Sequence, residues 1–151
     1  MAELKERLRA DLNAAMRARD QVRMRTLRMA LTSITNEEVA GASARDLTDD
    51  EVLKVLTREA RKRRDAAEAF SAAGRSDQAA AERAEGDVLA GYLPAQLSDD
   101  ELAALVDAAI AETGASGMAS MGQVMKTVTP RVANRADGAR VAAEVRRRLS
   151  G

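Results

Sequence analysis

The sequence predicts an all-helical protein, and three observations support this fold class. Ala, Leu, Arg and Glu, which all favour helices, dominate the composition, whereas the chain has only one Phe and one Tyr. Apolar residues recur every three or four positions through most of the chain, which is typical of amphipathic helices. Capping residues, glycines and prolines stand where such segments begin and end.

The first two predicted helices span residues 2–18 and 21–40. Asp20 lies between them and is a candidate N-cap, while Gly41 ends the second helix. Glu38 falls on the apolar row of the second helix, near its end, and is predicted to fold over the following loop. The apolar rows are Leu4, Leu8, Leu12 (or Ala15) and Met16 in the first helix, and Met24, Leu27, Leu31 and Ile34 in the second.

The stretch 47–97 predicts a helical hairpin. Thr48 followed by Glu51 is a capping box, and Gly74 suits the left-handed position just past a helix end. We expect Ser76 or Asp77 to cap the second arm. The apolar rows of the two arms are Val52, Leu53, Leu56, Ala60, Ala67 and Phe70, and then Ala81, Ala84, Val88 and Tyr92.

Two charged residues fall on the apolar faces of this hairpin. Arg63 lies in the apolar sector of the first arm and Glu85 on the apolar row of the second. Folding back at Gly74 brings them to roughly the same level, and a charge removed from water needs a hydrogen-bonded partner. We therefore predict a partly buried Arg63–Glu85 structural pair; the alternative is that Arg63 extends its side chain outward to solvent.

Pro94 marks the predicted boundary between an N-terminal helical domain, residues 1–93, and a small C-terminal helical bundle, residues 94–151. A second capping box, Ser98 with Glu101, starts a helix that ends at the glycines Gly114 and Gly117. Ser120 with Gln123 is predicted to begin a shorter helix that is disturbed at Pro130. Residues 134–138 form a predicted turn, and Asp137 caps a last helix through Val141, Ala142, Val145 and Leu149.

The composition excludes several classes of function. The chain has no Cys and no His, which removes disulfides, thiolate chemistry, the commonest general base and the commonest transition-metal ligand. No Ser/His/Asp set, P-loop, dinucleotide-binding glycine turn or metal-ligand spacing is present. We therefore expect no catalytic residues, no cofactor, no metal and no membrane segment, and a cytoplasmic protein.

The formal net charge is zero, but the charges are unevenly distributed. Residues 1–75 carry 16 Lys/Arg and 13 Asp/Glu, residues 76–112 carry 1 and 9, and residues 113–151 carry 7 and 2. A neutral average therefore conceals segments that could meet a polyanion.

Three groups of basic residues are candidate RNA-binding sites. The favoured group lies near the C-terminus; the alternative there is that basic residues are favoured at a helix C-terminus, which explains Arg146 to Arg148 but not the other four. The second group lies on the hairpin, where the alternative is a solvated helix face with Asp65 and Glu68 among the cations. The third lies around the first helix connection and could extend either of the other two, with a structural role for Arg28 as the alternative. The groups are Lys126, Arg131, Arg135, Arg140, Arg146, Arg147 and Arg148; then Lys54, Arg58, Arg61 and Lys62 with Arg64 and Arg75; then Arg17, Arg19, Arg23, Arg25 and Arg28.

Several motifs together resemble the GatB/YqeY family over nearly the whole chain. They are LTDDEVLKVLTREARKRRDAAEAFSAAGRSDQAAAE, GYLPAQLSDDEL, SMGQVMK and NRADGARV, in this order. The resemblance implies an N-terminal helical domain followed by a small helical bundle, similar to the tRNA-contacting tail of the GatB subunit of the glutamine-dependent tRNA amidotransferase. Asn134, where the family's turn more often has Gly, and Gly86 within a helix are departures from the family pattern.

Residues and resemblance together predict a non-catalytic accessory protein that binds tRNA, or an aminoacyl-tRNA or amidotransferase enzyme. With few aromatic side chains to stack on bases, such binding would be directed to phosphates and sensitive to salt. One alternative is a protein–protein adaptor that docks through Met118, Met121 and Met125. Another, by family label only, is a carbon–nitrogen ligase with glutamine as amido-N-donor.

Overall fold

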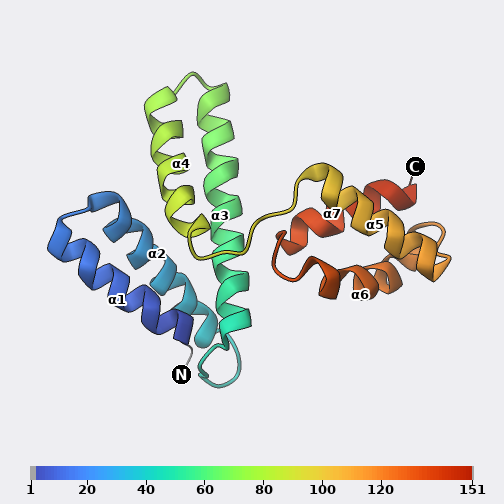
Figure 1. Ribbon diagram of the computed structural model, residues 1–151, viewed down its shortest axis with the longest axis horizontal. Coiled ribbons are helices and arrows are strands. Elements are labelled where there is room, and N and C mark those ends of the chain that lie inside the picture. The colour runs from blue at the N-terminus through green and yellow to red at the C-terminus, as the bar shows by residue number, and fades with distance from the viewer. Residues whose placement is uncertain (1–2, 151) are drawn as a thin grey trace. The chain divides into compact units, whose positions relative to one another are not determined.

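The computed structural model describes residues 3–150 and confirms the all-helical prediction, since no strand occurs in this range. The chain divides into two compact units, Met1–Leu93 (unit 1) and Pro94–Gly151 (unit 2). Each unit has its own hydrophobic core. We describe the units one at a time (Figure 1).

Unit 1 consists of two helical hairpins. Helices α1 (Glu3–Ala18) and α2 (Gln21–Glu38) form the first, and α3 (Asp49–Ala72) and α4 (Ser76–Ala90) form the second. The upper part of the α3–α4 hairpin extends beyond the α1–α2 pair (Figure 1). The core joins all four helices through fully buried side chains that include Leu8, Leu27, Ile34, Leu56 and Leu89.

The helix boundaries of unit 1 follow the predicted caps at most ends. The side chain of Asp20 accepts a hydrogen bond from the Arg23 backbone N–H, and Thr48 and Glu51 form the predicted capping box. Gly74 adopts the left-handed conformation, with φ +74°. The predicted cap of α4 was wrong: the N-cap residue is Arg75, which makes no side-chain capping bond, and the helix already begins at Ser76.

The buried face of α4 also differs from the prediction. Ala81 is exposed, whereas Ala79, Glu85, Val88 and Leu89 are buried. Alanine contributes little to a hydrophobic pattern. In an alanine-rich helix, packing against the neighbouring helix therefore decides which face is buried.

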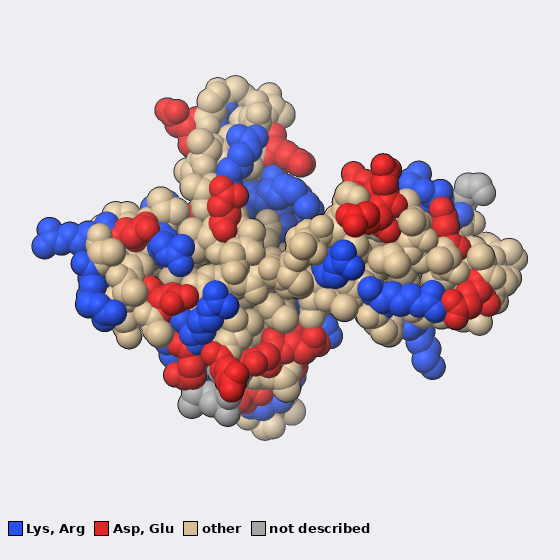
Figure 2. Space-filling model, in the orientation of Figure 1, with Lys and Arg blue, Asp and Glu red and all other residues tan. Residues whose placement is uncertain are grey.

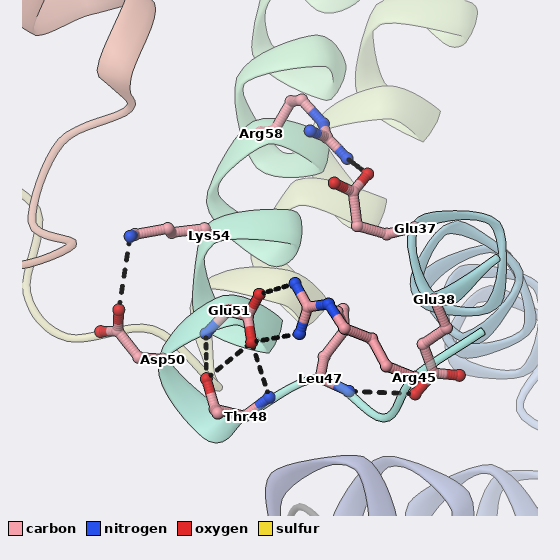
Figure 3. Close-up of polar contacts among 9 residues, drawn as sticks. All are labelled: Glu37, Glu38, Arg45, Leu47, Thr48, Asp50, Glu51, Lys54 and Arg58. Atoms are coloured by element: carbon pink, nitrogen blue, oxygen red, sulfur yellow. Dashed lines mark hydrogen bonds and ion pairs between the residues drawn. The ribbon is translucent and has the colours of Figure 1, made fainter. Parts of the chain in front are cut away.

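Two carboxylates hold the connection between α2 and α3 in place through hydrogen bonds (Figure 3). Glu38, at the end of α2, accepts hydrogen bonds from Lys5 Nζ at 2.8 Å and from the Leu47 backbone N–H at 3.3 Å. The hydrogen bond from Lys5 is the main reason that the pKa of Glu38 is lowered. Helix α2 therefore ends at Glu38, two residues before the predicted end, and Glu38 folds over the loop as expected.

The second carboxylate, Glu51, joins the loop to the first turn of α3. It pairs with Arg45 and accepts a hydrogen bond from the Thr48 backbone N–H (Figure 3). The hydrogen bond from Arg45, followed by that from Thr48, lowers the pKa of Glu51 to about 2. This carboxylate is consequently ionised throughout the physiological pH range.

The Tyr92 side chain links the C-terminal end of unit 1 to α1. Its hydroxyl donates a hydrogen bond to Asp11 Oδ2 at 2.5 Å, and the Arg7 guanidinium lies 4.7 Å from the ring centroid. Burial, and then the hydrogen bond to Asp11, raise the pKa of Tyr92 to about 12. The neutral phenol is the form that can donate to a carboxylate.

Unit 2 packs three helices around a core rich in valine. They are α5 (Asp99–Thr113), α6 (Met121–Val132), which follows the short 3₁₀ turn η1 (Met118–Ser120), and α7 (Gly138–Ser150). The fully buried side chains include Val106, Val124, Val128 and Val145. The Leu97 backbone N–H donates to the Arg135 carbonyl at 2.8 Å, which ties the start of the unit to its last turn.

The ends of the helices in unit 2 test four predictions. The Ser98–Glu101 capping box is confirmed, and α5 ends as predicted at Gly114, which is left-handed. Asp137 accepts a hydrogen bond from the Ala139 backbone N–H at 3.1 Å at the start of α7, as predicted. Ser120 is the N-cap residue of α6, so the helix begins where predicted, but its side chain makes no capping bond, because its hydroxyl donates to the Ser116 carbonyl at 3.2 Å.

The end of α6 also differs from the prediction of a disturbed helix. The helix continues through Pro130 to Val132, since only the last turn loses a backbone donor. Ala133 and Asn134 then adopt left-handed conformations, with φ of +50° and +65°. A left-handed residue at Asn134 gives a physical reason for glycine to be favoured at this turn.

Candidate nucleic-acid interface

The favoured basic group of unit 2 is distributed over α6, the following turn and α7. Lys126 and Arg131 lie on α6, Arg135 in the turn, and Arg140 and Arg146 to Arg148 on α7. Most of these side chains have partners inside the unit.

The acidic helix α5 supplies three of those partners. Arg131 pairs with Glu112, Arg140 Nη2 lies 2.9 Å from Asp99 Oδ1, and Arg148 Nη1 lies 3.3 Å from Asp107 Oδ2. In the sequence, α5 belongs to the acidic segment and α7 to the basic one. The fold brings these opposite charges together.

Glu144 and a backbone carbonyl supply the other partners. Glu144 accepts hydrogen bonds from Arg147 Nη2 at 2.7 Å and Arg148 Nε at 3.0 Å, and the bond from Arg147 is the main cause of its lowered pKa. Arg135 Nε donates to the Ala95 carbonyl at 3.3 Å. Lys126 and Arg146 are the exposed cations of this group that have no carboxylate within ion-pair distance among the residues described.

Unit 2 as a whole is therefore neutral. Residues 94–151 carry seven Lys/Arg and seven Asp/Glu, so the basic excess of residues 113–151 is balanced within the folded unit. Unit 1 is also balanced, with 17 of each in residues 1–93. Since neither unit has a net positive charge, a polyanion would have to bind a local cluster of cations on the surface of one unit.

The basic group on α3 is interleaved with acids. Lys54 Nζ lies 3.4 Å from Asp50 and Arg58 Nη2 lies 3.6 Å from Glu37, as Figure 3 shows. Arg61 pairs with Asp65 at 3.2 Å and Lys62 with Glu59 at 3.4 Å. Arg64 and Arg75 are exposed and have no carboxylate partner within the described chain. This face matches the solvated-face alternative more closely than a continuous cationic patch.

Arg63 lies in a partly buried cluster between α3 and α4. Its Nη1 lies 3.6 Å from Glu85 Oε2 and 3.5 Å from Glu82 Oε2, and its Nη2 lies 3.4 Å from Glu59 Oε2. The Arg63 side chain is 23% exposed, so it is turned inward rather than extended to solvent.

Three members of this cluster were not predicted from the sequence: Glu59, Glu82 and Arg25. Glu59 is buried and also accepts a hydrogen bond from Ser33 Oγ at 3.0 Å, while Arg25 Nε donates to Glu85 at 2.7 Å from α2. Glu59 stands three residues after Leu56, on the same face of α3, so the sequence pattern could have predicted its burial. Nothing in the sequence pattern predicts the pairing of Arg25 with Glu85, because only the packing of α2 against α4 brings them together.

The third basic group lies where α1 turns into α2, and it has the fewest acidic neighbours. Residues 12–36 contain five arginines and one acid, Asp20. Arg25 pairs with Glu85, and Arg28 Nη2 contacts Met16 Sδ at 3.4 Å. The exposed side chains of Arg17, Arg19 and Arg23 have no carboxylate within ion-pair distance in the described part of the chain. Blue side chains gather at this end of unit 1 in Figure 2.

The methionines of the adaptor alternative lie at η1 and α6. Met121 and Met125 are partly buried against the core of unit 2, whereas Met118 is 45% exposed. Only Met118 of the three is thus a large exposed apolar side chain.

The described residues contain no group of three or more acidic side chains placed to hold a metal ion. Among the helices of residues 3–150, none combines the length and the apolar character needed to cross a membrane.

A family model described as Yqey-like protein matches residues 5–149, nearly the whole chain. A search of curated proteins found no match.

Proposed function

Because this chain belongs to the YqeY-like protein family, we propose that it is a non-catalytic accessory protein that binds tRNA, free or held by a tRNA-handling enzyme. The contact is made to phosphates, through exposed arginine and lysine side chains. The resemblance of the C-terminal unit to the tail of the amidotransferase subunit favours tRNA as the RNA.

One observation carries the proposal: both units present exposed cations that no acidic side chain of the described chain neutralises. Such cations can release the counterions condensed on a nucleic acid, which is the main source of sequence-independent affinity. The guanidinium also matches phosphate geometry in a bidentate manner. The residues are Arg17, Arg19, Arg23, Arg28, Arg64, Arg75 and Arg83 in unit 1, and Lys126 and Arg146 in unit 2.

Aromatic side chains contribute little to this surface. Tyr92 is 7% exposed and Phe70 is partly buried, and no other aromatic residue is present. Stacking on unpaired bases is therefore minor, and binding should depend on backbone charge more than on base identity.

The test is the binding of purified bulk tRNA to the full chain, measured by fluorescence anisotropy across a salt series. We expect a dissociation constant on the order of 1–100 μM near physiological salt, with log K falling linearly as log[salt] rises. No binding at low salt would refute the proposal. Binding of a protein partner that is insensitive to salt would instead support the adaptor alternative.

The contribution of unit 2 can be measured separately with Lys126→Gln/Arg146→Gln. These two side chains have no carboxylate partner in the described chain, so their replacement should leave the fold intact. By contrast, Arg131, Arg140 and Arg148 pair with α5, and changing them would perturb the unit itself.

A further inference from the structure

The turn between α1 and α2 contains an unusual backbone conformation. Arg19 N–H donates to the Met16 carbonyl at 3.2 Å, and Asp20 N–H donates to the Ala15 carbonyl at 3.0 Å. This pair of bonds is the Schellman motif, in which the residue just past the helix end is left-handed. That residue is Arg19, with φ +57°.

Glycine is the residue that fits this position without strain. The chain uses glycine at the corresponding ends of α3 and α5, where Gly74 and Gly114 have φ of +74° and +66°. At the end of α1 it has an arginine. Left-handed residues other than glycine cost free energy and cluster at functional sites. The chain has another such helix end at Ala133, after α6, but alanine there carries no side chain that could bind a ligand.

The Arg19 side chain contributes no ion pair to the fold. It is exposed and has no carboxylate within ion-pair distance in residues 3–150, and the same holds for Arg17 and Arg23. The nearby acid, Asp20, accepts the Arg23 backbone N–H as the N-cap of α2. The strained arginine is therefore not explained by a stabilising ion pair.

We infer that Arg17, Arg19 and Arg23, here called the α1–α2 corner, form the principal phosphate-binding contact of unit 1 for the backbone of folded RNA. This inference rests on the proposed function and assigns it to one place. All the cations of residues 12–36 are arginines, whose planar fork binds phosphate oxygens in pairs.

The corner favours an extended polyanion over a small anion. Its three side chains are exposed on the last turn of one helix, a two-residue connection and the first turn of the next. Residues 12–36 contain no aromatic side chain. Such an arrangement allows contacts to successive phosphates along one strand, and these contacts do not require a particular base.

The experiment compares two triple variants of the full chain in tRNA binding across a salt series. The corner variant is Arg17→Gln/Arg19→Gly/Arg23→Gln. The matched control is Arg64→Gln/Arg75→Gln/Arg83→Gln, which removes the same charge from exposed arginines of unit 1 that also have no acidic partner in the described chain.

We expect the corner variant to bind bulk tRNA at least tenfold more weakly at low salt. Its slope of log K against log[salt] should be shallower by about 2–3, since each lost phosphate contact contributes about 0.7–0.9. The control removes three other cations of the proposed phosphate-binding surface, so it should also weaken binding, but by at least threefold less than the corner variant does. Equal losses in both variants would overturn the inference and leave the proposed function standing; no tRNA binding by the unmodified chain would overturn both.

A second probe separates RNA from an acidic protein partner. Polyglutamate, which carries carboxylates in place of phosphates, should compete with tRNA only weakly. If the corner variant loses polyglutamate binding but retains tRNA binding, the corner is a protein-binding site and the inference is wrong.

The single variant Arg19→Gly tests the role of backbone strain. Glycine relieves the left-handed conformation, so the melting temperature should rise by a few degrees while tRNA affinity falls. A lower melting temperature would show that Arg19 is kept for stability, and an unchanged affinity would show that its side chain does not contact the RNA; either result would overturn its place in the contact.

Discussion

Replacement of Arg63 by methionine should destabilise unit 1 more than replacement of any one of its carboxylate partners. Methionine preserves most of the aliphatic stem of the side chain but removes the charge. Arg63 lies within 3.6 Å of Glu59, Glu82 and Glu85, whose side chains are 6%, 20% and 11% exposed. Without the guanidinium, three poorly solvated carboxylates remain close together.

The magnitude follows from the partners that remain. Breaking a buried ion pair typically costs about 3–5 kcal/mol when one charge is left alone. Here Glu59 keeps Ser33 and Lys62, and Glu85 keeps Arg25. We therefore expect Arg63→Met to cost about 2–3 kcal/mol. Glu85→Gln should cost about 1 kcal/mol, because Arg63 still has two carboxylates.

The double variant tests whether Arg63 and Glu85 act on each other. With Arg63 already absent, Glu85→Gln removes one of three repelling charges and should be neutral or stabilising. The loss in the double variant should thus be smaller than the sum of the single losses by about 1 kcal/mol or more.

The assay is urea unfolding followed by tyrosine fluorescence. The chain has one Tyr, Tyr92, and no Trp, so the emission reports on unit 1 alone. With a urea dependence of about 1–3 kcal/mol/M, the midpoint of Arg63→Met should fall by about 0.7–3 M. Additive losses, or a loss below about 0.5 kcal/mol for Arg63→Met, would refute this reasoning.

Three further predictions concern other parts of unit 1. Gly86→Ala should stabilise α4 by about 0.5–1 kcal/mol, since a Cβ there meets only the Arg63 Cβ at an ordinary 3.7 Å; a lower urea midpoint would contradict it. Tyr92→Phe should cost about 1 kcal/mol through loss of the bond to Asp11, measured by circular dichroism, and an unchanged melting temperature would mean that the bond contributes nothing. The lowered pKa of Glu51 means that its stabilisation is present above pH 4.5 and is lost as the pH falls towards 2. Glu51→Gln, which keeps an oxygen for the capping bonds, should therefore lose less melting temperature between pH 5 and pH 2.5 than the unmodified chain, and an equal loss would assign the acid sensitivity elsewhere.

Local chemistry explains why several features were predictable. The capping boxes at Thr48 and Ser98 join residues three positions apart, and the Asp20 cap and Gly74 depend on a single turn of backbone. Such contacts are specified within a few residues and do not depend on the neighbouring helices. The failed prediction of a cap at Ser76 shows the limit, because a chain leaving a left-handed glycine can begin a helix without a side-chain cap.

The candidate site was less predictable for a physical reason. Charge counted along the sequence separates the acidic stretch 76–112 from the basic stretch 113–151. Folding places Asp99, Asp107 and Glu112 against arginines of α6 and α7, so the electrostatic footprint expected of the C-terminal unit is largely neutralised.

The sequence by itself determined the helices, most of their caps, the family and the absence of Cys and His, because each depends on residue type and short spacing. The tertiary structure decided which charges face one another: Arg25 with Glu85 from α2 to α4, and α5 against α7. It also identified the Arg19 conformation, which follows from how the end of α1 meets the start of α2. A charge acts on its surroundings over a few ångströms in space, and the sequence alone does not give those distances.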